Sequence, residues 1–160
     1  MATFAEDPHA DEELRTPAQA DSSSIEVTTS GGNGLPLTRQ CAACINGVHT
    51  EIVVTGYADR VNVLVTQLGS PGTILHASSE KSADGERRYE VKVLLGRRDD
   101  PLLAVYARQL IQRVDAREST GTGSSEDGRT IVVMLGLAKG GRDSSTFQAI
   151  MNLVLKARVW

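Results

Sequence analysis

The feature that most constrains the fold of this chain is a change in the spacing of its apolar residues at Asp99-Asp100-Pro101. Before this tripeptide, apolar and β-branched residues occur in short runs that often alternate with polar residues, which is the pattern of a β-sheet. Beyond it, apolar residues recur every three or four positions, which is the pattern of an amphipathic helix. The sequence therefore predicts a domain in which the part before this tripeptide forms a sheet and helices from the part after it pack on that sheet.

Five strands are predicted before this change, at residues 39–45, 48–55, 61–68, 73–77 and 89–95. The first two are joined by Asn46-Gly47, and both residues tolerate the positive φ angles of a type I′ turn, which predicts a hairpin. The polar stretch 78–87 is predicted to be a loop between the last two strands.

Two helices and one further strand are predicted after the change. Pro101 suits the first position of a helix because its missing N–H would have no partner there, and the apolar stripe continues to Val114. Residues 130–137 are almost wholly apolar, which predicts a strand buried on both faces. A last helix is expected from about Ser145, capped by Asp143 or by one of the serines that follow it.

The predicted element order is β-β-β-β-β-α-β-α, which indicates an α+β fold. We expect about six strands in a largely antiparallel sheet with two packed α-helices. A sandwich-like arrangement of the strands is an alternative that the order of elements leaves open.

The chain divides into two regions of opposite charge. Residues 1–38 hold seven acids and one arginine, which gives −6, whereas residues 39–160 hold sixteen bases and thirteen acids, which gives +3. The first region has almost nothing large to bury, so its ordering entropy cannot be offset. We therefore expect residues 1–38 to be a disordered acidic tail and residues 39–160 to form a single domain.

Several classes of protein are excluded by composition. No run approaches the roughly 18 to 20 apolar residues of a membrane-spanning helix, and the first 13 residues are acidic where a signal peptide would be basic and then apolar. The weak positive charge of residues 39–160 is not that of a nucleic-acid binder. Two cysteines are too few for a disulfide framework, which favours a reducing compartment, the cytoplasm or the nucleus.

No catalytic or metal site is predicted from the cysteines and histidines. Cys41 and Cys44 are three residues apart in a predicted strand, so their side chains would point to opposite faces and stay inert thiols. His9, His49 and His76 stand in no triad pattern with a serine nucleophile. We therefore expect no enzyme, no metal and no cofactor.

The Gly-rich turn Gly136–Arg142 carries the alternative function, a small nucleotide-binding protein or adaptor. Gly136 and Gly141 have the spacing of a phosphate-binding loop, but Arg142 and Asp143 stand where lysine and a hydroxyl residue are required. Candidates for contact with a partner protein are the dense basic pairs Arg87-Arg88 and Arg97-Arg98, and the last residue, Trp160.

Motifs follow one another in a recognisable order along the folded region. Thr50-Glu51-Ile52-Val53-Val54-Thr55 is followed by Val63-Leu64-Val65-Thr66-Gln67-Leu68-Gly69 and by Gly72-Thr73. Next come Lys92-Val93-Leu94-Leu95-Gly96, Asp100-Pro101-Leu102 with the helix through Ala107, and finally Val159-Trp160. In this order, over roughly residues 40–160, the chain resembles the proteasome assembly chaperone 3 family.

The resemblance implies a non-catalytic chaperone that pairs with a related subunit, proteasome assembly chaperone 4. Such a protein binds α-type subunits while the α-ring of the 20S proteasome forms, and it leaves before the mature particle is complete. A homodimer is the alternative that we expect when the partner is absent.

Overall fold

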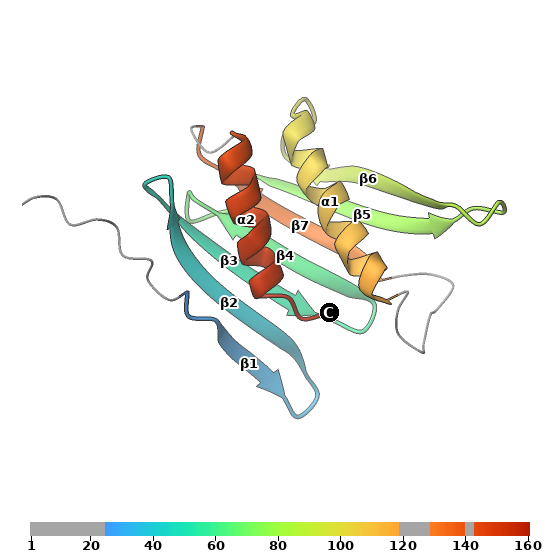
Figure 1. Cartoon of the computed structure of the whole chain (residues 1–160), viewed down its shortest axis with the longest axis horizontal. Helices are drawn as coiled ribbons and strands as arrows, with labels where there is room; N and C mark the ends of the chain where they lie inside the picture. The colour runs from blue at the N-terminus through green and yellow to red at the C-terminus, as the bar shows by residue number, and fades with distance from the viewer. Residues whose placement is uncertain (1–24, 119–128, 140–142) are drawn as a thin grey trace, which may run out of the picture.

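A seven-stranded sheet with two helices on one of its faces makes up the described part of the chain (Figure 1). The computed structural model describes residues 25–118, 129–139 and 143–160. The strands are β1 (Thr28–Gly32), β2 (Leu35–Ile45), β3 (Val48–Gly56), β4 (Arg60–Thr66), β5 (Thr73–Lys81), β6 (Arg87–Leu95) and β7 (Thr130–Gly136). The helices are α1 (Pro101–Glu118) and α2 (Ser144–Lys156).

The strand order is β1-β2-β3-β4-β7-β5-β6, so the last strand of the chain lies between two strands that precede it. β4 and β7 are parallel, and the other neighbouring strands are antiparallel. The predicted α+β fold with a largely antiparallel sheet is confirmed, with seven strands instead of about six. Because all seven belong to one sheet, the sandwich-like alternative does not describe this chain.

The core lies between one face of the sheet and the two helices. Helix α1 packs on β5, β6 and β7, and helix α2 packs on β2 and β3. Alternate residues of the central strands point into this layer, among them the fully buried Val63 of β4 and Val133 of β7. The helices meet where the rings of Tyr106 and Phe147 lie with their centroids 4.6 Å apart. None of the described helices is long and apolar enough to cross a membrane.

The domain boundary expected at residue 38 is wrong, because β1 and β2 form a hairpin that includes residues before it. Its turn, Asn33-Gly34, has φ angles of 50° and 84°. These are close to the 49° and 79° of Asn46-Gly47, which confirms the predicted hairpin between β2 and β3. Residues 1–24 lie outside the described residues, so the acidic tail stays a prediction there.

Two other expectations change in detail. The predicted loop 78–87 is shorter, because β5 continues to Lys81 and β6 begins at Arg87. The strand predicted at 130–137 is present as β7, but the described residues bury only one of its faces fully. Its side chains alternate between buried and partly exposed, and the partly exposed ones include Val132 and Met134. The first helix begins at Pro101, as predicted.

The hairpin of β1 and β2 leads to a test by truncation. We expect a chain that begins at residue 39 to be less stable than one that begins at residue 25. The longer truncation removes the pairing of Leu37 with Gly56 and the packing of Ile25 and Val27 against the core. Partial burial of two such side chains contributes about 1–3 kcal/mol, so urea unfolding should show a loss of that size. Equal unfolding midpoints for the two chains would contradict this contribution.

Helix α2 begins at a carboxylate cap. Asp143 accepts hydrogen bonds from the backbone N–H of Thr146 at 2.8 Å and from its hydroxyl at 2.7 Å. The hydrogen bond from the Ser145 hydroxyl, together with those from Thr146, holds the pKa of Asp143 well below its usual range. The Asn46 side chain donates to the same Thr146 hydroxyl oxygen at 2.9 Å, which ties the β2–β3 turn to the start of α2.

This cap predicts a pH-dependent difference in stability. The pKa of Asp143 is depressed in the folded state. Its contribution to stability is therefore present above the ordinary carboxyl pKa of about 4 and is lost as the pH falls toward the pKa of the folded state. We expect Asp143→Ala to lower the Tm at neutral pH, with the gap to the wild type narrowing in acid. Asp143→Asn keeps a capping oxygen and should lose less. Thermal unfolding followed by circular dichroism checks this, and a gap that is constant with pH would contradict it.

A candidate protein-interaction surface on the open face of the sheet

Both helices lie on the same face of the sheet, so neither covers the opposite face (Figure 1). Successive side chains of a strand point to opposite faces. Leu64 follows a buried valine in β4, and Met134 follows one in β7, so both project from the open face. Each is partly exposed to solvent.

These side chains belong to a row that crosses four strands in register. Val53 of β3 pairs with Leu64, Leu64 pairs with Met134, and Met134 pairs with Ile74 of β5. We call Val53, Leu64, Ile74 and Met134 the apolar row. All four are partly exposed, and side chains paired in this way touch their neighbours and form a continuous strip.

Polar residues border the apolar row on both sides. On one side, Asn62 of β4 and His76 of β5 project from the open face, and both pair with Val132 of β7, which lies between them. On the other side, Glu51 of β3 is exposed. An apolar centre with a polar border is the usual composition of a protein interface.

The apolar row extends toward β6 at one edge of the sheet. Ile74 pairs with Leu95, next to a register shift, and Leu94 and Leu95 are 57% and 64% exposed. Large apolar side chains that are gathered on one face indicate an interaction site more strongly than scattered ones.

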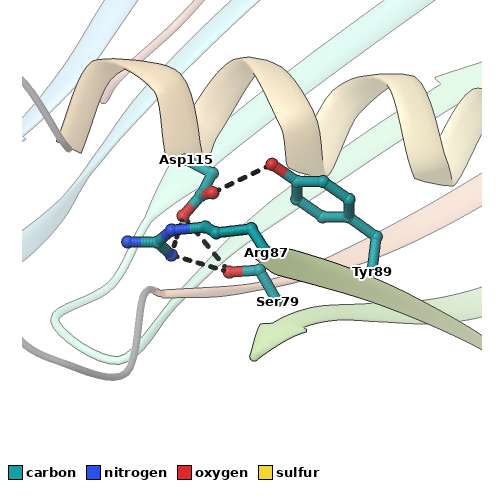
Figure 2. Close-up of polar contacts among 4 residues, drawn as sticks. All are labelled: Ser79, Arg87, Tyr89 and Asp115. Carbon is teal, nitrogen blue, oxygen red and sulfur yellow. Dashed lines mark hydrogen bonds and ion pairs between the residues drawn. The ribbon is translucent and has the colours of Figure 1, made fainter. Parts of the chain in front are cut away.

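Arg87, one of the predicted contact residues, belongs to a polar cluster under the end of α1 (Figure 2). Its guanidinium donates to the Asp115 carboxylate, and it donates to the Ser79 hydroxyl at 3.2 Å. Ser79 and Tyr89 donate to the same carboxylate at 3.2 and 3.0 Å. Burial, together with the neighbouring Asp115, raises the pKa of Tyr89.

This cluster joins three elements by their side chains. Asp115 lies near the carboxyl end of α1, where the helix dipole disfavours a negative charge, and its side chain is 4% exposed. The charge is tolerated because Arg87 of β6 and two hydroxyl groups compensate it. The cluster therefore fixes α1 on β5 and β6, and the Arg87 charge is matched within the chain.

The other predicted contact residues do not gather into one patch with Arg87. Arg88 is exposed beside it at the start of β6, whereas Arg97 and Arg98 are exposed beyond the other end of that strand. Arg97 lies 3.6 Å from a carboxylate oxygen of Asp99, and both side chains are well solvated. The two basic pairs thus lie at opposite ends of a nine-residue strand.

Trp160 packs partly buried against the core cluster. The segment that leads to it is held on the sheet, because Arg39 donates to the Arg158 carbonyl at 2.7 Å. A Cβ added to Gly56 would lie 2.9 Å from a Val159 methyl group, so this segment crosses β3 in close contact. Trp160 therefore contributes to the packing of the chain.

The cysteines and histidines are separated. Cys41 is buried, which raises the pKa of its thiol, and Cys44 is exposed. His49 lies 3.4 Å from Glu51, and His76 projects from the open face. His9 lies outside the described residues. Within the ranges that the structure describes, no three His, Cys, Asp or Glu residues come together as a metal site.

Gly136, the first residue of the glycine-rich turn, has a packing role. A Cβ at this position would lie 2.0 Å from the backbone carbonyl of Ser70, so a side chain cannot be accommodated without a backbone shift. The close approach of two loops therefore explains this glycine without a phosphate. Residues 140–142 of the turn lie outside the described part of the chain.

The apolar row was not identified from the sequence. The available indication was the nearly continuous apolar run of β7, which is typical of a strand covered on both faces. The helices cover one face only, so residues 25–118, 129–139 and 143–160 supply no second covering layer.

The cluster around Asp115 predicts different effects at two adjacent arginines. We expect Arg87→Glu to lower the free energy of unfolding by about 2–4 kcal/mol, because it removes a cation from the buried Asp115 carboxylate and places a second carboxylate beside it. Arg88→Glu is the matched control and should change stability by about 0.5 kcal/mol or less, because Arg88 is exposed. Chemical denaturation measures both, and equal losses would contradict the role of the cluster.

An open apolar strip with a polar border, on a small α+β domain, has the composition of a protein-binding surface. The family model for proteasome assembly chaperone 3 matches residues 63–157. The chain belongs to this family.

Two vertebrate relatives match almost their whole length. Bovine proteasome assembly chaperone 3 is 32% identical over 131 residues, which cover 81% of this chain and 98% of the relative. Human proteasome assembly chaperone 3 is 29% identical over 128 residues, which cover 79% and 96%.

The fold also resembles a solved structure, described as a novel chaperone complex for yeast 20S proteasome assembly. One chain of that complex superposes with a TM-score of 0.54 and 13% identity, covering 75% of this chain and 97% of the yeast chain. At this identity the likeness concerns the fold.

Proposed function

We propose that this chain is a non-catalytic chaperone that assists assembly of the α-ring of the 20S proteasome. It acts as a heterodimer with proteasome assembly chaperone 4, binds α-type subunits, and is released before the mature particle is complete. Its places of action are the cytoplasm and the nucleus. Membership of the proteasome assembly chaperone 3 family supports the proposal.

The observation that carries the proposal is the apolar row on the open face. Its four residues lie on the central strands β3, β4, β7 and β5, where a flat partner surface can contact all of them. Each Å² of apolar surface removed from water contributes about 25 cal/mol. A related subunit with the same fold would present a face of the same kind, and two such faces can pack sheet on sheet.

The nucleotide-binding alternative has less support. Gly136 is explained by its contact with the Ser70 carbonyl, and Arg142 stands where a phosphate-binding loop requires lysine. A free-standing adaptor would differ from the proposed chaperone in one measurable respect, since it would have no affinity for proteasome α-type subunits.

The apolar row can be tested by replacing two of its residues together. In Leu64→Thr/Met134→Thr, apolar surface is lost but the preference for strand is kept, so the sheet should still form. Leu35→Thr is the matched control, because Leu35 is 71% exposed and lies in β2 outside the row. Tagged chains are purified from cells at near-physiological salt, circular dichroism checks their folding, and mass spectrometry identifies the proteins recovered with them.

We expect the wild type and the Leu35→Thr control to recover a small chaperone partner and α-type subunits, without mature β-type subunits. The double variant should recover at least about tenfold less partner, which corresponds to a loss of 1.4 kcal/mol. Undiminished recovery by a folded double variant would show that the row is not the interface. A wild type that recovers no α-type subunit would overturn the proposed function.

A further inference from the structure

A cleft opens where the carboxyl ends of β4 and β7 meet the start of α1. Its volume is about 390 Å³. Leucine side chains form most of its apolar wall, and two exposed cations, Arg97 and Lys139, complete the lining. The leucines are Leu68, Leu103, Leu135 and Leu137. Among the described residues that line the cleft there is no carboxylate.

One of these leucines is exposed although its loop is held in place. Leu68 is 62% exposed, and its backbone N–H donates to the Thr66 hydroxyl at 3.2 Å. Next to it, the Gln67 N–H donates to the Gly136 carbonyl at 2.8 Å, and the Gln67 side chain accepts the Ala138 N–H at 3.0 Å. Leu68 is therefore an apolar side chain presented to solvent on a fixed backbone, which lowers the entropy cost of binding a partner.

Close backbone packing fixes the shape of the cleft as well. A Cβ at Gly96 would lie 2.4 Å from the Gly72 carbonyl oxygen. A Cβ at Gly136 would likewise clash with the Ser70 carbonyl. The turns that follow β4, β6 and β7 are thus packed against one another at this end of the sheet. A cleft that exists before binding favours a specific ligand over a nonspecific one.

The electrostatic character of the cleft favours a negatively charged ligand. α1 begins at this end of the sheet (Figure 1), and the positive end of its dipole lies at the same end as Arg97 and Lys139, whereas the start of α2 is already occupied by the Asp143 carboxylate. The nearby acids Asp99, Asp100 and Asp143 lie outside the lining. Asp143 caps α2, and Asp99 forms a long, solvated contact with Arg97, which is weak.

We propose that this cleft binds a segment of a partner protein in which an apolar side chain of leucine size lies next to a carboxylate. The leucine walls take the apolar side chain, and Arg97 with Lys139 takes the carboxylate. This assigns a peptide-binding role to a region at the end of the sheet, distinct from the apolar row.

We place the segment on a proteasome α-type subunit, and this assignment rests on the proposed function. Leu103 of α1 and the buried Leu135 of β7 lie on the helix side of the sheet, whereas the apolar row lies on the opposite face. A chaperone subunit bound to the row therefore leaves the cleft accessible to a third protein.

The cleft itself can be tested without any proteasome subunit. N-acetyl-leucine carries the proposed apolar side chain and carboxylate, N-acetyl-leucinamide lacks the charge, and N-acetylglycine lacks the side chain. We expect methyl NMR of the full chain to show saturable shifts at Leu68 and Leu137 with N-acetyl-leucine. Binding should be about threefold or more weaker with either control compound.

The variants for this titration are Lys139→Glu and Arg98→Glu. Lys139→Glu should abolish the shifts, because it places a negative charge in the cleft. Arg98→Glu should leave them unchanged, because Arg98 is exposed but outside the lining. No saturable shift at the cleft leucines, or equal binding of the acid and the amide, would overturn the peptide-binding role.

A second experiment tests the occupant. When full-length chains are purified from cells, Leu68→Ser and Lys139→Glu should each reduce recovery of α-type subunits at least fivefold, while the chaperone partner is recovered as before. If N-acetyl-leucine binds the cleft but both variants recover as much α-type subunit as the wild type, the assignment of the segment to these subunits is wrong. If the wild type recovers no α-type subunit, the proposed function fails, and the NMR titration still decides whether the cleft binds its peptide class.

Discussion

The insertion of β7 between β4 and β5 is the constraint on which the rest of the structure depends. β4 and β5 follow one another in the chain but are not paired, so β7 alone joins the β1–β4 part of the sheet to the β5–β6 hairpin. Its alternate residues Ile131, Val133 and Leu135 are buried under the helices. Because β7 runs parallel to β4, the chain must return along the sheet before β7 begins, and α1 provides this return over one face.

The position of β7 also explains why one face of the sheet is open. α1 covers the strands on one side of the centre and α2 covers those on the other, both on the same face. Met134 and Val132 then project from a central strand to the uncovered side, where a sheet with helices on one face only would ordinarily carry polar residues. The apolar row is therefore a consequence of topology together with a strand sequence that suits burial on both faces.

The sequence predicted those elements whose side chains carry a regular pattern. The β2–β3 hairpin, β7 and both helices were predicted because apolar periodicity and local turn or cap residues agree there. β1 was missed although Asn33-Gly34 is the same dipeptide as Asn46-Gly47, because every residue of β1 is exposed and backbone pairing alone forms the strand. No apolar pattern can mark such a strand.

The role of Arg87 could not be predicted for a different reason. Its partner Asp115 is 28 positions away, on a helix whose rotation over the sheet is a property of tertiary packing. Local sequence shows the charge but not the carboxylate that matches it. The cleft is likewise assembled from turns after β4, β6 and β7, and no single segment contains enough of its lining to indicate it.

The separation of the apolar row and the cleft has a functional consequence. The row lies on the open face and the cleft at the end of the helix side, so two proteins bound at these places would not compete for the same residues. Where the two bound proteins also contact each other, each contact with this chain can be of moderate size, because the second binding event then takes place at a raised effective concentration. Contacts of moderate size can also be broken one at a time, which would suit the release that we propose for this chaperone.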